Sequence, residues 1–287
     1  MEDINRTTTI ELPSEVSAEI LAKTQEASAV MQLARQITLP GNGAIIPVIT
    51  ADPTAAWVGE TDPKPVSNST LDTKKMQAYK LAVIETFSQE FVRDAKSLYD
   101  ELVRRLPAAL ALQFDATVFG ATAAPGENFD TFANVTAQSI ATDAYDGLVA
   151  ADTDIATHGG ILDGFVVSPQ AKGILLAAKD GNERPLFINS VAEGAIPMIL
   201  GARTLQSKGA YKAGSPDVVG FAGDWTQALY GTVEGVKISV SDQATLTTGN
   251  KTINLWQQNM VAVRAEIEVG FRADTTVFNK LTGANNA

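Results

Sequence analysis

Few residues in this sequence could do nucleophilic or metal chemistry. Among the 287 residues there is one histidine, His158, and no cysteine. The lack of cysteine excludes disulfides, thiolate zinc sites and cysteine nucleophiles. A Ser–His–Asp triad would have to use His158, which lies beside Gly159 and Gly160 at the end of an expected helix. That position is typical of a surface residue that caps a helix, so we expect no catalytic role for it.

The motifs that bind dinucleotides, phosphate or calcium are incomplete. Residues 41–43, Gly-Asn-Gly, lack the third glycine of a dinucleotide fingerprint, and no phosphate loop ending in Gly-Lys-Ser or Gly-Lys-Thr occurs. Asp152 and Asp154 lack the later ligands of an EF-hand loop. We therefore predict no cofactor, no cofactor-binding residue and no metal-binding residue.

Paired carboxylates remain a route to catalysis, since a glycosidase needs only two. Glu90 and Asp94 share a face of an expected helix, but Arg93 and Lys96 lie beside them. This set is typical of a solvated charged face, so we predict no catalytic residue and a protein that is not an enzyme.

Charge and composition exclude further classes. The chain has 22 Lys plus Arg and 33 Asp plus Glu, a formal charge of −11, which argues against a surface that grips nucleic-acid phosphates. Hydrophobic residues make up 45% of the chain, too many for intrinsic disorder. No apolar run approaches the roughly 18 residues that a membrane helix needs, so we expect no membrane partner.

The elements that must position these residues begin with an extended segment. Ser14 is suited to cap a short helix, and the Pro-Gly-Asn-Gly run at 40–43 ends the segment. Between these two points the segment has a loose apolar stripe: Val16, Ile20, Leu21, Ala27, Val30, Met31 and Leu33. Nothing nearby in the sequence would bury this stripe, which predicts an arm over residues 1–44.

Residues 45–87 predict a long two-stranded hairpin with a polar tip near 63–72. A helix is excluded by four prolines, Pro47, Pro53, Pro63 and Pro65. Trp57 and Val58 form an isolated apolar pair in a polar stretch, and residues 76–87 are apolar enough for a long return strand. Because a two-stranded hairpin is marginal alone in water, we expect it to dock on another surface.

Residues 88–120 give the strongest helix signal. Ser88 suits the N-cap, Gly120 suits the end, and Pro107 should kink the helix. Apolar residues recur every three or four positions: Phe91, Ala95, Leu98, Leu102, Leu106, Leu110, Phe114 and Val118. The pattern predicts a long spine with one buried face.

The remaining chain mixes helices and strands. Helices are predicted over 142–155 and 170–179, the second capped by Ser168 and started by Pro169, with a buried strand over 165–167 between them. Residues 220–242 predict short strands, with Glu234-Gly235 as a hairpin turn. Strict alternation over residues 261–272 predicts a long, half-buried final strand.

This order of elements, together with specific strings, resembles the major capsid proteins of tailed bacteriophages, which have the Hong Kong 97 fold. The strings in the first part of the chain are Ala56-Trp57-Val58-Gly59-Glu60, Tyr79-Lys80-Leu81-Ala82 and Phe87-Ser88-Gln89-Glu90-Phe91. Those in the rest are Val166-Val167-Ser168-Pro169, Lys179-Asp180-Gly181-Asn182, Pro185-Leu186-Phe187, Gly223-Asp224-Trp225, Ala228-Leu229-Tyr230-Gly231 and Met260-Val261-Ala262-Val263-Arg264-Ala265-Glu266.

The resemblance implies an α+β fold of four parts. They are an N-arm over 1–44, an extended E-loop hairpin over 45–87, a peripheral domain over 88–135 and 243–287 with the spine helix and long strand, and an axial α/β domain over 136–242. It implies a virion shell subunit that assembles with itself as pentamers and hexamers, in the host cytoplasm, into an icosahedral shell. Double-stranded DNA would be enclosed without sequence-specific binding, and a scaffolding protein, a portal and a decoration protein would be partners.

The physical reading agrees, since the two extended segments expose apolar residues that a neighbouring copy can cover. We expect intersubunit contacts through Trp57, Glu60 and Lys64 of the E-loop and through Ile20 and Val30 of the N-arm.

Two alternatives stay open on the sequence. An encapsulin-like compartment shell would share the fold but hold enzyme cargo. A soluble carboxylate-dependent hydrolase would be a small species with a deep acidic cleft.

Overall fold

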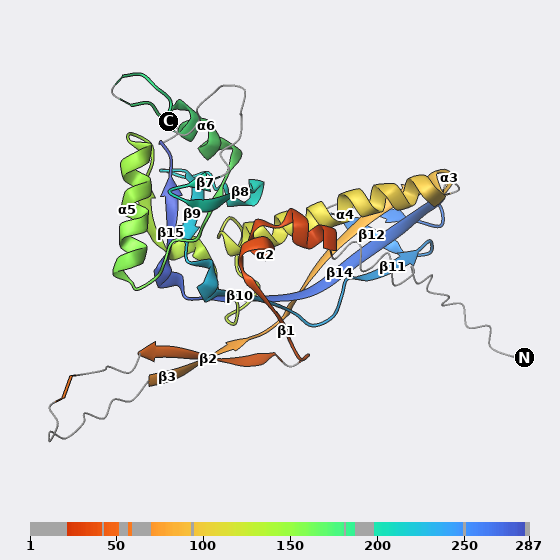
Figure 1. Cartoon of the computed structure of the whole chain (residues 1–287). Coiled ribbons are helices and arrows are strands. Elements are labelled where there is room, and N and C mark those ends of the chain that lie inside the picture. The colour runs from red at the N-terminus through yellow and green to blue at the C-terminus, as the bar shows by residue number, and fades with distance from the viewer. Residues whose placement is uncertain are drawn as a thin grey trace, which may run out of the picture.

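The computed structural model describes residues 22–41, 43–51, 57–58, 70–92, 95–180, 182–186, 198–248 and 251–284. Figure 1 shows a main body, with one block of structure at each end, and an arm that leaves the body. A long sheet runs beside helix α4 (Ala95–Val118) at one end, and a second sheet lies beside helix α5 (Ala144–Thr157) at the other. Strands β2 (Ala44–Ala51) and β3 (Thr70–Met76) form an arm that extends away from both.

The first sheet is organised around one long strand, β14 (Met260–Ala273). One edge of β14 pairs antiparallel with β4 (Tyr79–Ser88). The other edge pairs antiparallel with β10 (Ala228–Thr232) and then β11 (Lys237–Ser241), and β1 (Arg35–Thr38) adds parallel to β10. The long apolar strand predicted after Met76 is therefore β4, and it belongs to this sheet and not to the arm.

The alternation predicted over residues 261–272 is confirmed in β14. All six apolar members of the pattern are buried: Val261, Val263, Ala265, Ile267, Val269 and Phe271. Arg264, on the opposite face, is exposed and pairs with Glu266 at 3.3 Å. Residues two apart point to the same face of a strand, so one face of β14 supplies core along its full length.

The hairpin predicted at Glu234-Gly235 is wrong. β10 and β11 do not pair with each other; both follow the same edge of β14. Thr232 pairs with Val269 and Lys237 with Glu266. Between these two pairs the chain advances five residues from β10 to β11 but only three along β14. The turn residues therefore form an irregularity inside one interrupted strand, where extra residues leave the ladder as in a bulge.

Helix α4 covers the buried face of this sheet. The helix predicted over 88–120 is present as α3 (Gln89–Val92) and α4, with Pro107 inside α4. The second half of the predicted apolar face is buried: Leu106, Leu110, Phe114 and Val118. Gly120 follows the helix with a φ of +74°, a left-handed conformation that favours glycine. The kink at Pro107 stays a prediction.

The second block is built on a six-stranded sheet. Its strands, in spatial order, are β5 (Thr136–Ser139), β15 (Phe278–Thr282), β9 (Val218–Gly223), β6 (Gly164–Val167), β8 (Ala202–Gln206) and β7 (Met198–Ile199). The strand predicted at 165–167 is thus confirmed as β6, and all four of its residues are buried. β15 lies in this sheet, whereas β10 and β11 lie in the first; the predicted boundaries at 136, 242 and 243 stay predictions.

Two capped helices flank this second sheet, one of them with the predicted cap. Ser168 accepts a hydrogen bond from the amide of Ala171 and Pro169 begins α6 (Pro169–Ala177), as predicted. Asp143 caps α5 in the same way. Stacked and edge-on rings fill the space behind the sheet: Phe119, Phe132, Phe221, Trp225 and Phe278.

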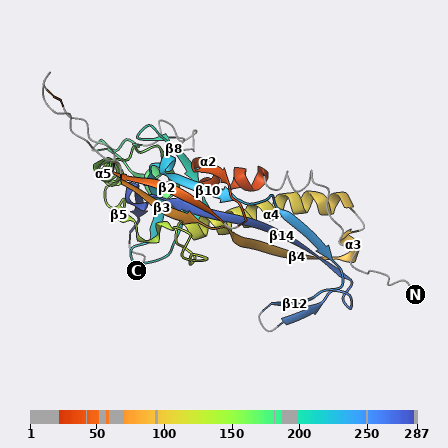
Figure 2. The same cartoon turned by 90° about the horizontal axis from the view of Figure 1, so that it is seen from below.

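Short elements complete the described chain. Strands β12 (Thr245–Thr248) and β13 (Lys251–Asn254) pair only with each other among the described residues. Figure 2 shows this pair projecting near the end of β14 and β4. The 3-10 turns are η1 (Phe132–Asn134), η2 (Lys208–Ala210), η3 (Trp225–Gln227) and η4 (Thr275–Val277).

The N-terminal segment is more firmly built into the body than predicted. Residues 22–27 are helical and lead into α2 (Ala29–Leu33). Val30 is completely buried in the subunit's own core, which corrects the expectation that it contacts a neighbouring subunit. The sequence could not reveal this, because Val30 packs against elements that are distant in the chain. Ile20 and the predicted cap Ser14 lie outside the described residues.

A buried carboxylate, Asp115 of α4, anchors this segment. Its oxygens accept hydrogen bonds from the Ser28 hydroxyl at 2.6 Å, the Ala29 amide at 3.0 Å and the Ser207 hydroxyl at 2.7 Å. Asp115 is 1% exposed. One side chain therefore joins the N-terminal segment, the spine helix and the chain before η2, and its acceptors satisfy buried donors from each.

Asp115→Ala should lower the free energy of unfolding by about 3 kcal/mol, because several buried donors lose their acceptor together. Urea denaturation of the full chain measures this. A loss below about 1 kcal/mol, the size expected for one ordinary hydrogen bond, would contradict the anchoring role.

The same carboxyl should make stability depend on pH. Burial raises the pKa of Asp115 above its ordinary value of 3.8, against the smaller lowering effect of its hydrogen bonds. The folded state then binds more protons than the unfolded state, so the free energy of unfolding falls as pH rises from 3.8 through the raised pKa. Asp115→Asn removes this titration. The difference in unfolding free energy between the wild type and this variant should therefore become smaller as the pH rises across that window. A difference that is constant with pH would exclude this linkage.

Candidate intersubunit surface

The residues considered for chemistry occupy structural positions. His158 is the C-cap of α5, as predicted, with its ring Nδ1 2.8 Å from the carbonyl oxygen of Asp154. Glu90 is exposed in α3, and Asp94 lies outside the described residues. Within the described part of the chain, no group of three His, Cys, Asp or Glu residues is placed to hold a metal ion.

A pair of carboxylates that the sequence analysis did not single out, Asp163 and Asp224, lies beside β6. Burial raises the pKa of Asp163, and the negative charge of Asp224 raises it further. Asp163 accepts a hydrogen bond from the Trp225 amide at 2.8 Å, and Asp224 accepts one from the Ile161 amide at 3.0 Å. Both carboxylates thus accept hydrogen bonds from backbone amides in and near η3, and this structural role explains their position without a catalytic one.

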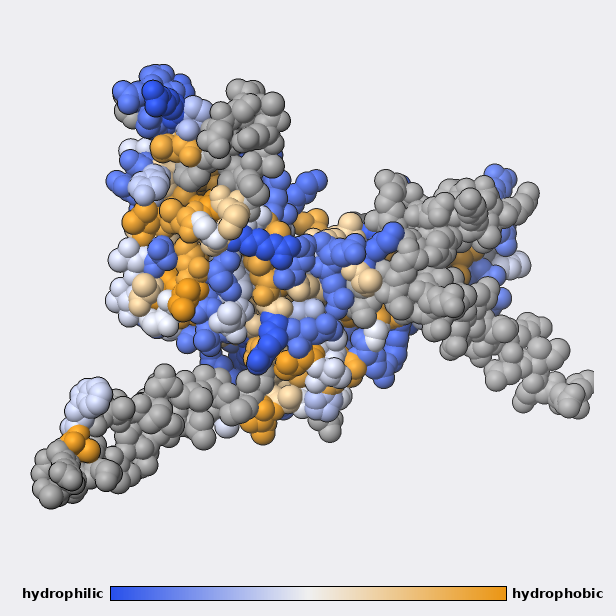
Figure 3. All heavy atoms as spheres, viewed as in Figure 1, coloured by the Kyte–Doolittle hydropathy of each residue, from blue (hydrophilic) through white to orange (hydrophobic). Residues whose placement is uncertain are grey.

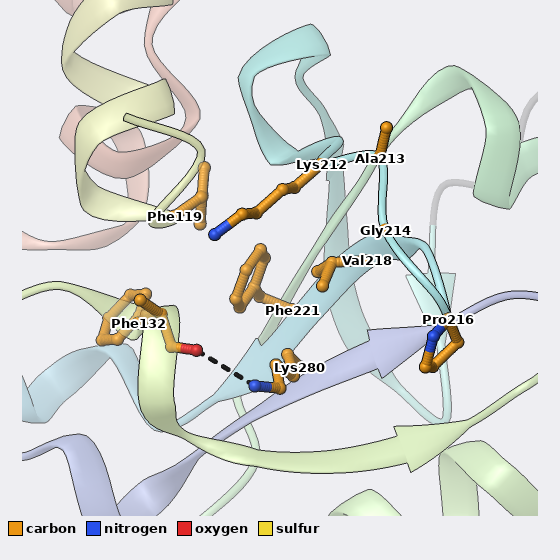
Figure 4. A pocket seen from close by; sticks show the side chains of 10 residues that line it. Phe119, Phe132, Lys212, Ala213, Gly214, Pro216, Val218, Phe221 and Lys280 are labelled. Atoms are coloured by element: carbon orange, nitrogen blue, oxygen red, sulfur yellow. Dashed lines mark hydrogen bonds between the residues drawn. The ribbon is translucent and has the colours of Figure 1, made fainter. Parts of the chain in front are cut away.

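A small hollow beside the second sheet contains two lysines (Figure 4). It has a volume of about 120 Å³ and a floor of Phe119, Phe132 and Phe221. Lys212 donates to the carbonyl oxygen of Gly120 at 2.9 Å, and Lys280 donates to that of Ala133 at 3.0 Å. Gly120 lies two residues beyond the end of α4, so Lys212 places a positive charge near the negative end of the spine helix. The hollow is therefore best explained as a capping site.

The arm is where large apolar side chains lie outside the core. Its strands pair from Ala44 opposite Met76 to Ala51 opposite Thr70, so a two-stranded hairpin is present, but its return strand is residues 70–76 and not the predicted 76–87. Trp57 is fully exposed at 105%, and Ile45 is 71% exposed. Figure 1 places the short described segment of residues 57–58 far from the body. Glu60 and Lys64, the other predicted contacts of this arm, lie outside the described residues.

Further exposed apolar residues lie on the body. Ile84 of β4 is 50% exposed on the face of the first sheet opposite α4. On the second block, Ile161 is 78% exposed, and Tyr145 and Val149 of α5 lie at its surface. Figure 3 shows hydrophobic residues at the surface of that block. No helix in the described ranges is both long and apolar enough to span a membrane.

Charge on the open face of the first sheet is arranged in compensating pairs. Lys80 lies 3.5 Å from Glu268, and Lys237 lies 2.7 Å from Glu234. These exposed pairs contribute little to stability, typically below about 1 kcal/mol each. Apolar arm residues and a mixed, paired sheet face suit contact with another protein surface better than chemistry on a small molecule.

Comparisons with known proteins agree on one family. A model of the phage capsid family matches residues 10–275. The probable major capsid protein of Mycobacterium phage D29 is 31% identical over 94% of this chain and 89% of its own length. The probable major capsid protein of Mycobacterium phage L5 is also 31% identical, over 96% of this chain and 90% of its own.

Solved structures agree on the fold. A chain of Gordonia phage Cozz superposes with a TM-score of 0.73 at 20% identity, covering 90% of this chain and 87% of that one. A capsid chain of an empty GTA particle superposes with a TM-score of 0.64 at 16% identity, covering 90% of each chain.

Lys212→Met should cost about 1 kcal/mol of unfolding free energy, since one hydrogen bond to a helix end is lost. Denaturant titration measures the change, and Lys208→Met, at an exposed lysine of η2, is the matched control. An equal loss in both variants would contradict the capping role. So would a phosphate-dependent rise in the melting temperature that the Lys212 variant lacks, because the hollow would then bind an anion.

Proposed function

The chain belongs to the phage capsid family, and from this premise we propose how its parts build a shell. It is the major capsid protein of a tailed phage, a structural virion component and not an enzyme, with the Hong Kong 97-type fold. Copies assemble as pentamers and hexamers into an icosahedral shell that encloses double-stranded DNA. The hydrolase alternative is thereby excluded, and the relatives named above favour a virion shell over an encapsulin-like compartment.

The exposed arm is the observation that carries this proposal. Trp57 and Ile45 are accessible to water in the single subunit, although each would gain from burial. Burying a large apolar side chain contributes about 2–3 kcal/mol. A contact of this kind, repeated by symmetry around a closed shell, gives strong assembly from modest individual interactions. We propose that Trp57, Glu60 and Lys64 contact a neighbouring copy, and that Ile20 does so from the N-terminal segment.

Charge supports enclosure of DNA without specific recognition. The formal charge of −11 disfavours tight binding to phosphates. On the first sheet, Lys80 is paired with Glu268 and Arg264 with Glu266. We propose that the packaged DNA is contained and not gripped. Assembly would take place in the host cytoplasm with a scaffolding protein, a portal and a decoration protein as partners.

Trp57→Ala should reduce the yield of closed shells at least about tenfold, because the loss is repeated at every copy of a symmetric assembly. Electron microscopy and size-exclusion chromatography of the expressed protein measure the shells. The circular dichroism and melting temperature of the unassembled subunit should be unchanged, since the side chain is outside the core.

Two variants make this test specific. Trp57→Phe keeps a large apolar ring and should retain shells. Trp225→Ala removes a tryptophan that is 1% exposed and should instead destabilise the subunit. Unfolding of the subunit by Trp57→Ala, or normal shells from it, would contradict the proposed contact.

A further inference from the structure

Two cationic side chains tie the root of the arm to the body: Lys74 of β3 donates to the carbonyl oxygen of Ala273 at 3.1 Å, and Arg272 of β14 makes the larger set of bonds. Arg272 has a side chain that is only 12% exposed. Its Nε and Nη2 both donate to the carbonyl oxygen of Lys75, at 2.9 and 2.7 Å. Lys75 is the residue before Met76, the last residue of β3. These two bonds therefore hold the backbone of the arm and not a mobile side chain.

The other side of the same guanidinium holds a loop of the body. Its Nη1 donates to Asp130 Oδ1 at 2.7 Å, and its Nη2 donates to Asn128 Oδ1 at 3.1 Å. Asp130 is itself fixed on β14, since its amide donates to the carbonyl of Phe271 and its Oδ2 accepts from the amide of Ala273. The guanidinium thus bridges a rigid loop and the arm. Only its planar fork can serve both sides at once.

The link between β3 and β4 is fixed by the same loop. Asn128 is held by two further hydrogen bonds. Its backbone amide donates to the Tyr79 hydroxyl at 3.2 Å, and its side-chain amide donates to the Gln77 side chain at 3.3 Å. Met76, between the arm and this link, is fully buried. A Cβ added at Gly231 would lie 2.9 Å from the Met76 sulfur, so this glycine leaves the room that Met76 fills. The root of the arm is therefore packed and hydrogen-bonded on several sides.

We propose that Arg272 is a positioning residue for assembly: it sets the direction in which the arm leaves the subunit. Exposed charge pairs on the same strand, such as Arg264 with Glu266, hold only side chains to each other. Arg272 instead joins the backbone of the arm to the body. Its value for assembly rests on the proposed function of the arm, whereas its effect on arm direction can be measured in a single subunit.

The absence of cysteine makes a distance measurement direct. Cysteines introduced at Ile49 in β2 and at Leu112, an exposed position of α4, can carry two spin labels on the full-length, unassembled chain. Pulsed electron resonance should give one narrow distance distribution. Arg272→Gln should shift and broaden it, and Arg272→Lys should do the same to a lesser extent, since an ammonium cannot bridge both partners.

Arg264→Gln is the matched control, because it removes an arginine from the same face of the same strand. It should leave the distribution unchanged. If Arg272→Gln does not fold, Asp130→Asn, which weakens the loop side of the clamp, should broaden the distribution in its place. An unchanged distribution in the folded Arg272 or Asp130 variants would overturn the proposal.

Shell yield separates this inference from the proposed function. Loss of shells together with a broadened distribution supports both. A broadened distribution with a normal yield of shells would leave the clamp standing and overturn the role of the arm in assembly. Loss of shells with an unchanged distribution would overturn the clamp and leave the proposed contact of the arm intact.

Discussion

The burial of one face of β14 is the constraint on which the rest of the subunit depends. The strand is long, and α4 covers it through Leu106 and Leu110 around Val263 to Ile267 and through Phe114 against Phe271. Both edges of the strand are also occupied, by β4 on one side and by β10 and β11 on the other. The arm, the spine helix and the second block are then all attached to one rigid element, and each is placed relative to the others by its contact with β14.

The parts with a strong local pattern could be predicted from sequence. β14 follows from strict alternation, the second half of α4 from its apolar spacing, and the start of α6 from Ser168 and Pro169. A hairpin arm follows from prolines and an isolated tryptophan, but its return strand is residues 70–76 and not the predicted 76–87. These features are decided within a few neighbouring residues, so the sequence contains the information needed.

The parts decided by distant contacts could not be predicted. The local sequence of Val30 is typical of an arm, but its segment is bound by Asp115, which lies 85 positions later in the chain. Glu234-Gly235 has the composition of a hairpin turn, but β14 keeps both flanking strands on one edge. Arg272 reads as an ordinary member of a charged outer face, since nothing in its neighbourhood in the sequence reveals the carbonyl of Lys75. Of the expected contact residues, Trp57 is placed in the open by the structure, whereas Glu60, Lys64 and Ile20 lie outside the described residues.

The arm behaves as a lever with its fulcrum beside β14. The eight residues of β2 span about 26 Å at a rise of about 3.3 Å per residue. A rotation of about 5° at the fulcrum would move the far end of that strand by about 2 Å, more than the tolerance of a close-packed contact. The curvature of the proposed shell, built from many such levers, is then sensitive to the packing of a few atoms around Met76, and small substitutions there change its size.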